Sequence, residues 1–201
     1  MSLKQEIAVE AFVGSLTYVP SSKQVWGIGS DRKIRIWNAT VRVINSLAPS
    51  CERYKCLMRA CFWRSMQDCS LVSEFNSTHE NKVNSITHID GFVWTTSDDA
   101  TIKIWDAVKH ERVASYADFH SSKVYGVAKV ASTVWSFSWD RSIHVWDAKT
   151  LAHRERLPTT FHDDAVSGIV AHRNTKYQCW QAITSSLDRA IVAWLVNEAA
   201  S

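Results

Sequence analysis

A serine, a histidine and an aspartate stand in this chain in an order that could form a hydrolytic triad. Ser136 lies 16 residues after His120 and four before Asp140. A triad of this kind would let the serine attack a carbonyl carbon while the histidine takes up its proton. The set recurs with threonine as the hydroxyl: Thr95 with His79 and Asp99, and Thr184 with His162 and Asp188. Three equivalent active sites in 201 residues would be unusual, so a structural role is favoured over catalysis.

The stretch that carries Ser136 predicts a β-hairpin. Thr133 to Asp147 reads TVWSFSWDRSIHVWD, in which apolar and polar residues alternate on both sides of a short polar turn. Similar stretches begin at Trp26, Trp94 and Trp180. In all four copies the turn aspartate lies six residues before a tryptophan: Asp31 and Trp37, Asp99 and Trp105, Asp140 and Trp146, Asp188 and Trp194. A spacing kept in four copies indicates an internal repeat.

The repeat resembles the WD-repeat family of β-propellers. The dipeptide Trp-Asp ends the middle two copies, at Trp105-Asp106 and Trp146-Asp147. It has become Trp37-Asn38 and Trp194-Leu195 in the outer two. A histidine before the first strand is the second mark of the family, and it stands at His79, His120 and His162, while Val9 takes this place in the first copy. The resemblance implies an all-β fold of propeller blades.

The same resemblance assigns the triad-like residues to the blade interior. In this family the indole N–H, a serine or threonine, the histidine and the turn aspartate form one hydrogen-bonded chain, which stabilises the blade because buried polar groups are costly unless paired. The implied structural residues are His79, Thr95, Asp99 and Trp105; His120, Ser136, Asp140 and Trp146; His162, Thr184, Asp188 and Trp194; and Asp31 and Trp37, where Gly27 takes the hydroxyl position.

We predict one propeller domain over residues 1–201, with four-stranded blades near 10–47, 79–117, 120–158 and 162–197. Strands are expected at 13–19, 24–29 and 33–37, a fourth from 41–44, and one more at 3–9 that would complete the last blade. Between Trp37 and Trp105 there are 27 residues more than between Trp105 and Trp146, too few for a blade. They predict an insertion over 45–75 with a short amphipathic helix, and they equally fit sequence foreign to the fold. Its cysteines, 51, 56, 61 and 69, match no zinc pattern.

Four blades predict an incomplete or unusual ring. The fourth copy reaches only its third strand by Val196, and WD-repeat propellers usually have about seven blades. Three interpretations follow, in decreasing order of preference. The chain is a fragment of a longer propeller, or two chains form one eight-bladed ring as a homodimer, or four blades close into a strained ring. An open arc would expose an apolar blade face at each end.

Composition narrows the class of partner. The net charge of +3 is too small to indicate a nucleic-acid or membrane-surface protein. No run of eighteen apolar residues occurs, so no membrane-spanning helix is expected, and the N-terminal residues lack the apolar core of a signal peptide. These features favour the cytoplasm and reduced cysteines. No cofactor and no metal are expected.

Binding to a protein partner is therefore the predicted function. In this family the face that carries the inter-blade loops and inner hairpin turns is the usual docking surface. The positions that map to it are Lys82, Asn84 and Asp98 in the second blade; Lys123, Tyr125, Trp139 and Arg141 in the third; and Ala165, Ser167 and Leu187 in the fourth. Aromatic anchors dominate interface energies, so the third blade is favoured, although Trp139 could instead pack locally. We predict a non-catalytic scaffold; the alternative is a regulatory module or fragment of a larger signalling enzyme.

Overall fold

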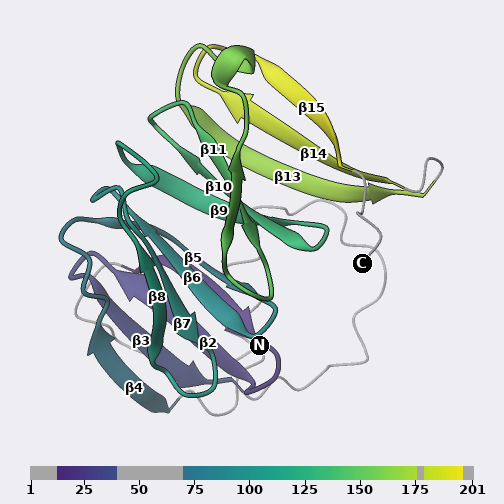
Figure 1. The fold of residues 1–201 in the computed structure, drawn as a ribbon. Helices are drawn as coiled ribbons and strands as arrows, with labels where there is room; N and C mark the ends of the chain where they lie inside the picture. The colour runs from purple at the N-terminus through teal and green to yellow at the C-terminus, as the bar shows by residue number, and fades with distance from the viewer. Residues whose placement is uncertain (1–12, 40–69, 176–178, 197–201) are drawn as a thin grey trace, which may run out of the picture.

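The computed structural model describes residues 13–39, 70–175 and 179–196 (Figure 1). These residues contain fifteen β-strands and one short 3-10 helix. The strands are β1 (Val13–Val19), β2 (Gln24–Gly29), β3 (Lys33–Asn38), β4 (Leu71–Asn76), β5 (Val83–Ile89), β6 (Phe92–Ser97), β7 (Ile102–Asp106), β8 (Arg112–Tyr116), β9 (Val124–Val130), β10 (Thr133–Ser138), β11 (Ile143–Asp147), β12 (His153–Arg156), β13 (Val166–Asn174), β14 (Cys179–Ser186) and β15 (Ile191–Val196); η1 covers Thr159–Phe161. The predicted all-β fold is confirmed.

The strands form four antiparallel sheets, which we number as blades 1 to 4. Blades 1, 2 and 3 have four strands in chain order, β1 to β4, β5 to β8 and β9 to β12, and blade 4 has the three strands β13 to β15. The second and third strands of each blade form the hairpins that the alternation predicted; Trp135, for example, lies opposite Val145. Figure 1 shows the blades following one another, from blade 1 at the lower left to blade 4 at the upper right.

Blade 1 differs from the sequence prediction at its outer strand. Its fourth strand is β4, with Phe75 opposite Ile34 and Leu71 opposite Trp37, and not the stretch 41–44. The long insertion therefore lies within blade 1, between its third and fourth strands, and residues 71–75 belong to the sheet. Residues 3–9 and 41–44, the expected helix and the four cysteines of the insertion lie outside the described residues.

Each blade packs one face against the next, and the repeat sets which residues meet. At the first interface, blade 1 contributes Trp26, Ile28, Ile34 and Ile36, which pack against Val83, Ile86, Val93 and Trp105 of blade 2. The next interface uses the same repeat positions: Trp94, Ile102 and Ile104 against Val124, Val127, Val134 and Trp146. The third interface sets Trp135, Phe137, Ile143 and Val145 against Val166, Ala182, Ile169 and Trp194. Burial between blades therefore supplies the apolar core that a single sheet cannot form.

No closed ring is formed by the described residues. The apolar clusters join blade 1 to 2, 2 to 3 and 3 to 4, and none of them joins blade 4 to blade 1. Within these ranges no helix is long and apolar enough to cross a membrane, and no group of three or more histidine, cysteine or acidic side chains is placed to hold a metal ion.

The inner hairpin turns hold a residue in the left-handed backbone region directly after the turn aspartate. Arg32, Ala100, Arg141 and Arg189 have φ angles of 61°, 64°, 66° and 69°. This conformation costs a residue with a Cβ atom roughly 1–2 kcal/mol, whereas glycine adopts it freely. The repeat therefore keeps four strained positions at the same point of the turn.

We expect Ala100→Gly to raise the free energy of unfolding by about 0.5–1 kcal/mol, because relief of the left-handed strain exceeds the added entropy of the unfolded chain. Urea denaturation measures the change. Ala114→Gly in β8, where the backbone is extended, is the control and should lower stability by a similar amount. A loss of stability in both variants would contradict the argument.

Candidate interaction face and the polar networks beneath it

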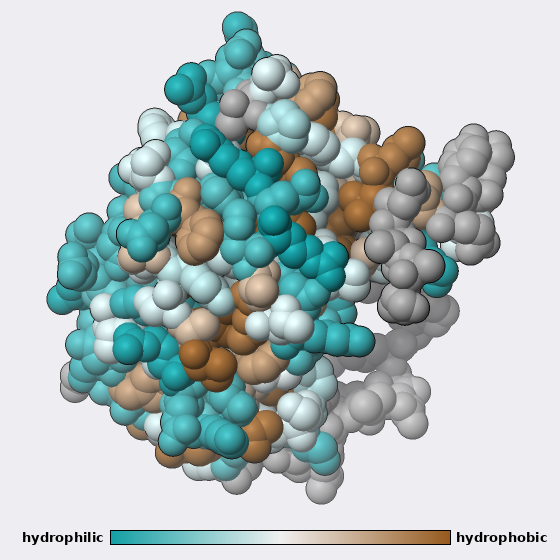
Figure 2. All heavy atoms as spheres, viewed as in Figure 1, coloured by the Kyte–Doolittle hydropathy of each residue, from teal (hydrophilic) through white to brown (hydrophobic). Residues whose placement is uncertain are grey.

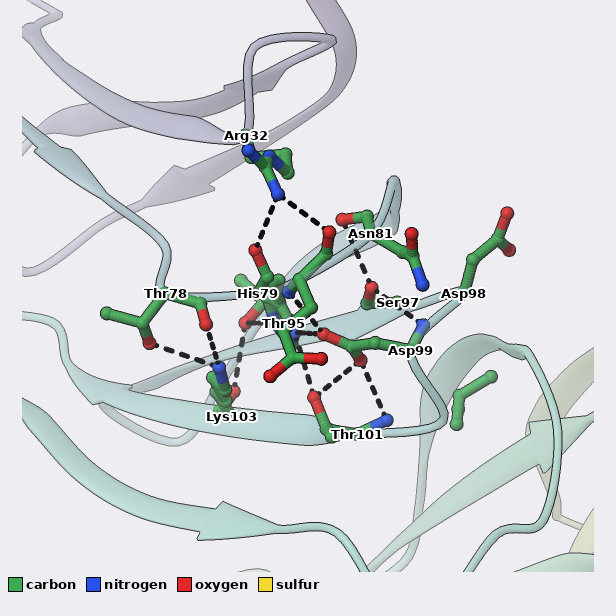
Figure 3. A network of polar contacts seen from close by, with 12 residues as sticks. Arg32, Thr78, His79, Asn81, Thr95, Ser97, Asp98, Asp99, Thr101 and Lys103 are labelled. Atoms are coloured by element: carbon green, nitrogen blue, oxygen red, sulfur yellow. Dashed lines mark hydrogen bonds and ion pairs between the residues drawn. The ribbon is translucent and has the colours of Figure 1, made fainter.

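Blade 2 contains the complete hydrogen-bonded chain that the family resemblance implied. Figure 3 shows the part of it that runs from Thr95 through His79 to Asp99. The Trp105 indole Nε1–H donates to Thr95 Oγ1 at 3.1 Å, and Thr95 Oγ1 lies 3.0 Å from His79 Nε2. On the other side of the ring, His79 Nδ1 lies 3.0 Å from Asp99 Oδ2. Thr101 donates its hydroxyl and its backbone N–H to the same carboxylate. The network therefore ties the loop before β5 to the β6–β7 turn.

Blades 3 and 4 repeat this arrangement. In blade 3, Ser136 Oγ lies 2.9 Å from Trp146 Nε1 and 2.8 Å from His120 Nε2, and His120 Nδ1 lies 3.1 Å from Asp140 Oδ2. In blade 4, Thr184 Oγ1 lies 3.0 Å from Trp194 Nε1 and 2.7 Å from His162 Nε2. The last link is looser there, since His162 Nδ1 lies 3.5 Å from Asp188 Oδ2.

The serine, histidine and aspartate of blade 3 have triad-like distances but no access to a substrate. Ser136 is fully buried and also accepts the indole N–H, so no reacting carbonyl can reach its oxygen. Burial by itself would raise the pKa of the Asp140 carboxyl, but hydrogen bonds from His120 and Ser142 hold it well below its usual range. Asp99 is held low in the same way by His79 and Thr101. Both aspartates therefore stay ionised as fixed acceptors.

Blade 1 replaces the hydrogen-bonded chain with packing and ion pairs. At Gly27, the hydroxyl position of the other blades, an added Cβ atom would meet Trp37 and Leu16 at 2.8 and 2.7 Å, so these side chains fill the space. The turn aspartate, Asp31, forms an ion pair of 2.5 Å with Arg35, and Arg35 also pairs with Glu74 of β4 at 2.7 Å. This network could not be predicted from the sequence, because Glu74 lies in β4, within the stretch 45–75 that was predicted to be an insertion.

The predicted interaction face is a connected surface in blades 2 and 3. The ring of Trp139 lies edge to face with that of Tyr125, with centroids 6.0 Å apart, and Trp139 is 47% exposed. Beside them Lys123 Nζ lies 3.5 Å from Asp98 of blade 2. Asn84 donates to Asp98 Oδ1 and to the backbone carbonyl of Val124, at 2.8 and 3.0 Å. These contacts bring five of the predicted positions together across the blade boundary.

Most of the other predicted positions are exposed, but one of them is buried. Lys82 and Arg141 are exposed on the same face, as are Ser167 and Leu187 in blade 4, whereas Ala165 is fully buried. Arg32 reaches from blade 1 to the backbone carbonyl of Glu80 at 2.6 Å, so its guanidinium links blades 1 and 2 (Figure 3).

A cluster of three histidines within blade 3 was not predicted from the sequence. His144 Nδ1 lies 2.9 Å from His153 Nε2, and the His144 ring lies 4.6 Å from that of His120. The repeat spacing does give a signal, because Arg35 and Lys103 occupy the position of His144 in blades 1 and 2. Burial, followed by the charges that His120 and His153 can carry, lowers the pKa of His144 to about 4.

This lowered pKa predicts that stability falls between pH 6.5 and pH 4. The unfolded chain binds a proton at His144 below about pH 6.5, whereas the folded chain does so only below about pH 4, so acidification favours unfolding in this window. We expect a loss of about 3 kcal/mol from this residue across the window. His144→Val, which copies Val192 of blade 4, should remove that part of the slope in urea denaturation at several pH values. An unchanged slope would contradict the assignment.

The fold and the polar networks define a class of protein: repeated propeller blades, three of which contain a buried Trp–Thr/Ser–His–Asp chain. Residues 69–106 match the family model described as WD domain, G-beta repeat. This chain therefore contains a WD repeat and has the fold of WD-repeat propeller blades, which confirms the resemblance inferred from its motifs.

Solved structures share this fold at low sequence identity. The crystal structure of the computationally designed Ika4 protein is similar with a TM-score of 0.68 and 16% identity, over 98% of this chain and 99% of that one. The structure of U3-55K is similar with a TM-score of 0.62 and 15% identity, over 94% of this chain and 53% of that one, so this chain spans about half of the U3-55K structure. No curated protein sequence shows significant similarity to this chain.

Proposed function

We propose that this protein is a non-catalytic scaffold that binds a partner protein through the face built from Lys123, Tyr125 and Trp139, with Lys82, Asn84, Asp98 and Arg141 around them. The WD repeat and its structural neighbours support a protein-interaction role in general. The observation that carries the finer assignment is the exposure of Trp139. A large aromatic ring left 47% exposed is available as an interface anchor.

The neighbours of Trp139 fit an interface centre. Tyr125 supports its ring from one side, and the Lys123–Asp98 and Asn84–Asp98 contacts place a paired polar rim next to it. An aromatic centre with a polar rim is the usual composition of protein interfaces. Arg141, two residues after Trp139 and exposed, adds a cation that suits an acidic group on the partner.

We expect Trp139→Ala to abolish partner capture while leaving the free energy of unfolding within about 0.5 kcal/mol, because the side chain is exposed. Affinity purification from cells followed by quantitative mass spectrometry measures capture, and thermal denaturation measures stability. Val108→Ala is the matched control, since Val108 is 69% exposed on the β7–β8 turn. If Trp139→Ala and the wild type captured a partner equally well, the proposed binding face would be wrong.

Absence of catalysis is part of this proposal. It rests on the burial of Ser136 and on the recurrence of the same polar chain in three blades. Ser136→Ala is therefore expected to act on stability and not on a turnover rate. The cytoplasmic location stays a prediction.

A further inference from the structure

The third strand of blade 4 forms an open sheet edge in the described part of the chain. In blades 1, 2 and 3 the third strands β3, β7 and β11 each pair with a fourth strand. Strand β15 pairs with β14 alone. An edge strand offers a row of backbone donors and acceptors to any extended chain that approaches it.

The outer face of blade 4 is apolar and exposed beside this edge. Ile183 and Ile191 stand at the repeat positions of Trp135 and Ile143, which are buried between blades 3 and 4. In blade 4 they are 37% and 73% exposed, and Val170 and Leu195 beside them are 66% and 71% exposed. Val170 lies opposite Ile183 in the sheet, so these side chains share a face. Figure 2 shows hydrophobic atoms gathered over the region of blade 4.

A pocket of about 290 Å³ lies at the junction of blades 3 and 4, next to β15. Trp135 and Trp194 line it, and Arg154 and Glu155 of β12 border it. The pocket joins the open edge to the interior of the blade interface, because Leu195 and Val196 of β15 also line it.

At the other two junctions the chain itself fills the corresponding place. His110, five residues after Trp105, lies edge-on to Trp26 with ring centroids 5.3 Å apart. Leu151, five residues after Trp146, is buried in the cluster that contains Trp94. Both side chains come from the turn between the third and fourth strands of a blade. The pocket at Trp135 is therefore shaped for a side chain of leucine or histidine size presented by such a turn.

We propose that blade 4 binds an extended segment of a partner polypeptide, which pairs antiparallel with β15 and places a leucine-sized side chain in the pocket at Trp135. The repeats also specify a second anchor six residues later, as Tyr116 follows His110 and Leu157 follows Leu151. Tyr116 lies opposite Ile102, so the second anchor covers the equivalent Ile191. The partner sequence thus carries two apolar residues six apart, with a strand between them. Strand addition of this kind combines backbone pairing with side-chain pockets.

A partner polypeptide fits this site better than a second copy of the chain. Strands β4, β8 and β12 are already paired within their own sheets. From its described residues a second copy therefore offers no outer strand that is free of its own blade. The turn before its β15 does carry Leu187, but this leucine lies four residues before the strand, whereas Leu151 lies two residues before β12, and the position six residues after Leu187 is the small Ala193. The site at β15 is separate from the face around Trp139 and does not depend on the proposed function.

The test uses a fluorescent synthetic peptide with the sequence of residues 147–157, DAKTLAHRERL, which contains both anchors. Fluorescence anisotropy with the full-length protein should give saturable binding with Kd below about 1 mM. Leu151→Ser in the peptide should weaken binding at least about tenfold, because the pocket side chain is lost. In the protein, Ile191→Lys should weaken binding by a similar factor. Val108→Lys, on the exposed β7–β8 turn of blade 2 and outside both proposed sites, should leave it unchanged.

Each other outcome overturns the proposal. Equal binding of the Leu151→Ser peptide and the unchanged peptide would show a nonspecific contact. A monomeric protein that does not bind the peptide would assign the site to a segment of this chain, and a non-binding dimer in light scattering would assign it to a second copy. Thermal denaturation of Ile191→Lys and Val108→Lys checks that both variants are folded.

Discussion

Ser136→Ala is expected to lower the free energy of unfolding by about 2–5 kcal/mol. The change removes one oxygen that serves two buried groups, the Trp146 indole N–H at 2.9 Å and the His120 Nε2 atom at 2.8 Å. Each buried polar group left without a partner costs about 1–3 kcal/mol. Urea denaturation followed by circular dichroism measures the loss.

The repeat supplies the control for this experiment. Ser136→Thr keeps the hydroxyl and copies Thr95 and Thr184, which hold the same contacts in blades 2 and 4. It should stay within about 1 kcal/mol of the wild type. If Ser136→Ala cost less than about 1 kcal/mol, the polar chain would be dispensable and the structural role assigned to it would be wrong.

The residues of the polar chains could be predicted because they recur at fixed spacing and occupy the positions that the resemblance to WD repeats assigns to the blade interior. His120 and Ser136 were placed together from sequence, and they lie 2.8 Å apart. The outer strand of blade 1 could not be placed in this way. The stretch 41–44 reads Val-Arg-Val-Ile, which is also compatible with a strand, and only the pairing of Phe75 with Ile34 shows that β4 is the strand next to β3. That pairing is a contact between residues 41 apart, which local periodicity does not report.

For the interaction face, too, the sequence predicted the single positions but not the contacts between them. The resemblance indicated Lys123, Asp98 and Asn84 one by one, as positions of their own blades. Their contact across the blade 2–blade 3 boundary depends on how two sheets pack, so it became visible only in the structure. The fourth repeat predicted three strands up to Val196, and the described part of blade 4 has these three strands. The pocket beside them was not predicted, because it depends on which side chain fills each junction, as Leu151 does between blades 2 and 3.

Trp94→Ala is expected to lower the free energy of unfolding by about 3–5 kcal/mol, because Trp94 is fully buried between blades 2 and 3 and its loss leaves a cavity.

The indole N–H of Trp94 makes no hydrogen bond within the described residues, whereas the N–H of the equivalent Trp135 donates to Thr133 at 3.0 Å. Trp94→Phe should therefore cost about 1–2 kcal/mol less than Trp135→Phe, since only the second change breaks a hydrogen bond. Chemical denaturation of the three variants measures these differences. Equal costs for the two phenylalanine variants would mean that the Trp94 indole has a hydrogen-bond partner after all, and a small cost for Trp94→Ala would mean that blades 2 and 3 do not share a packed core.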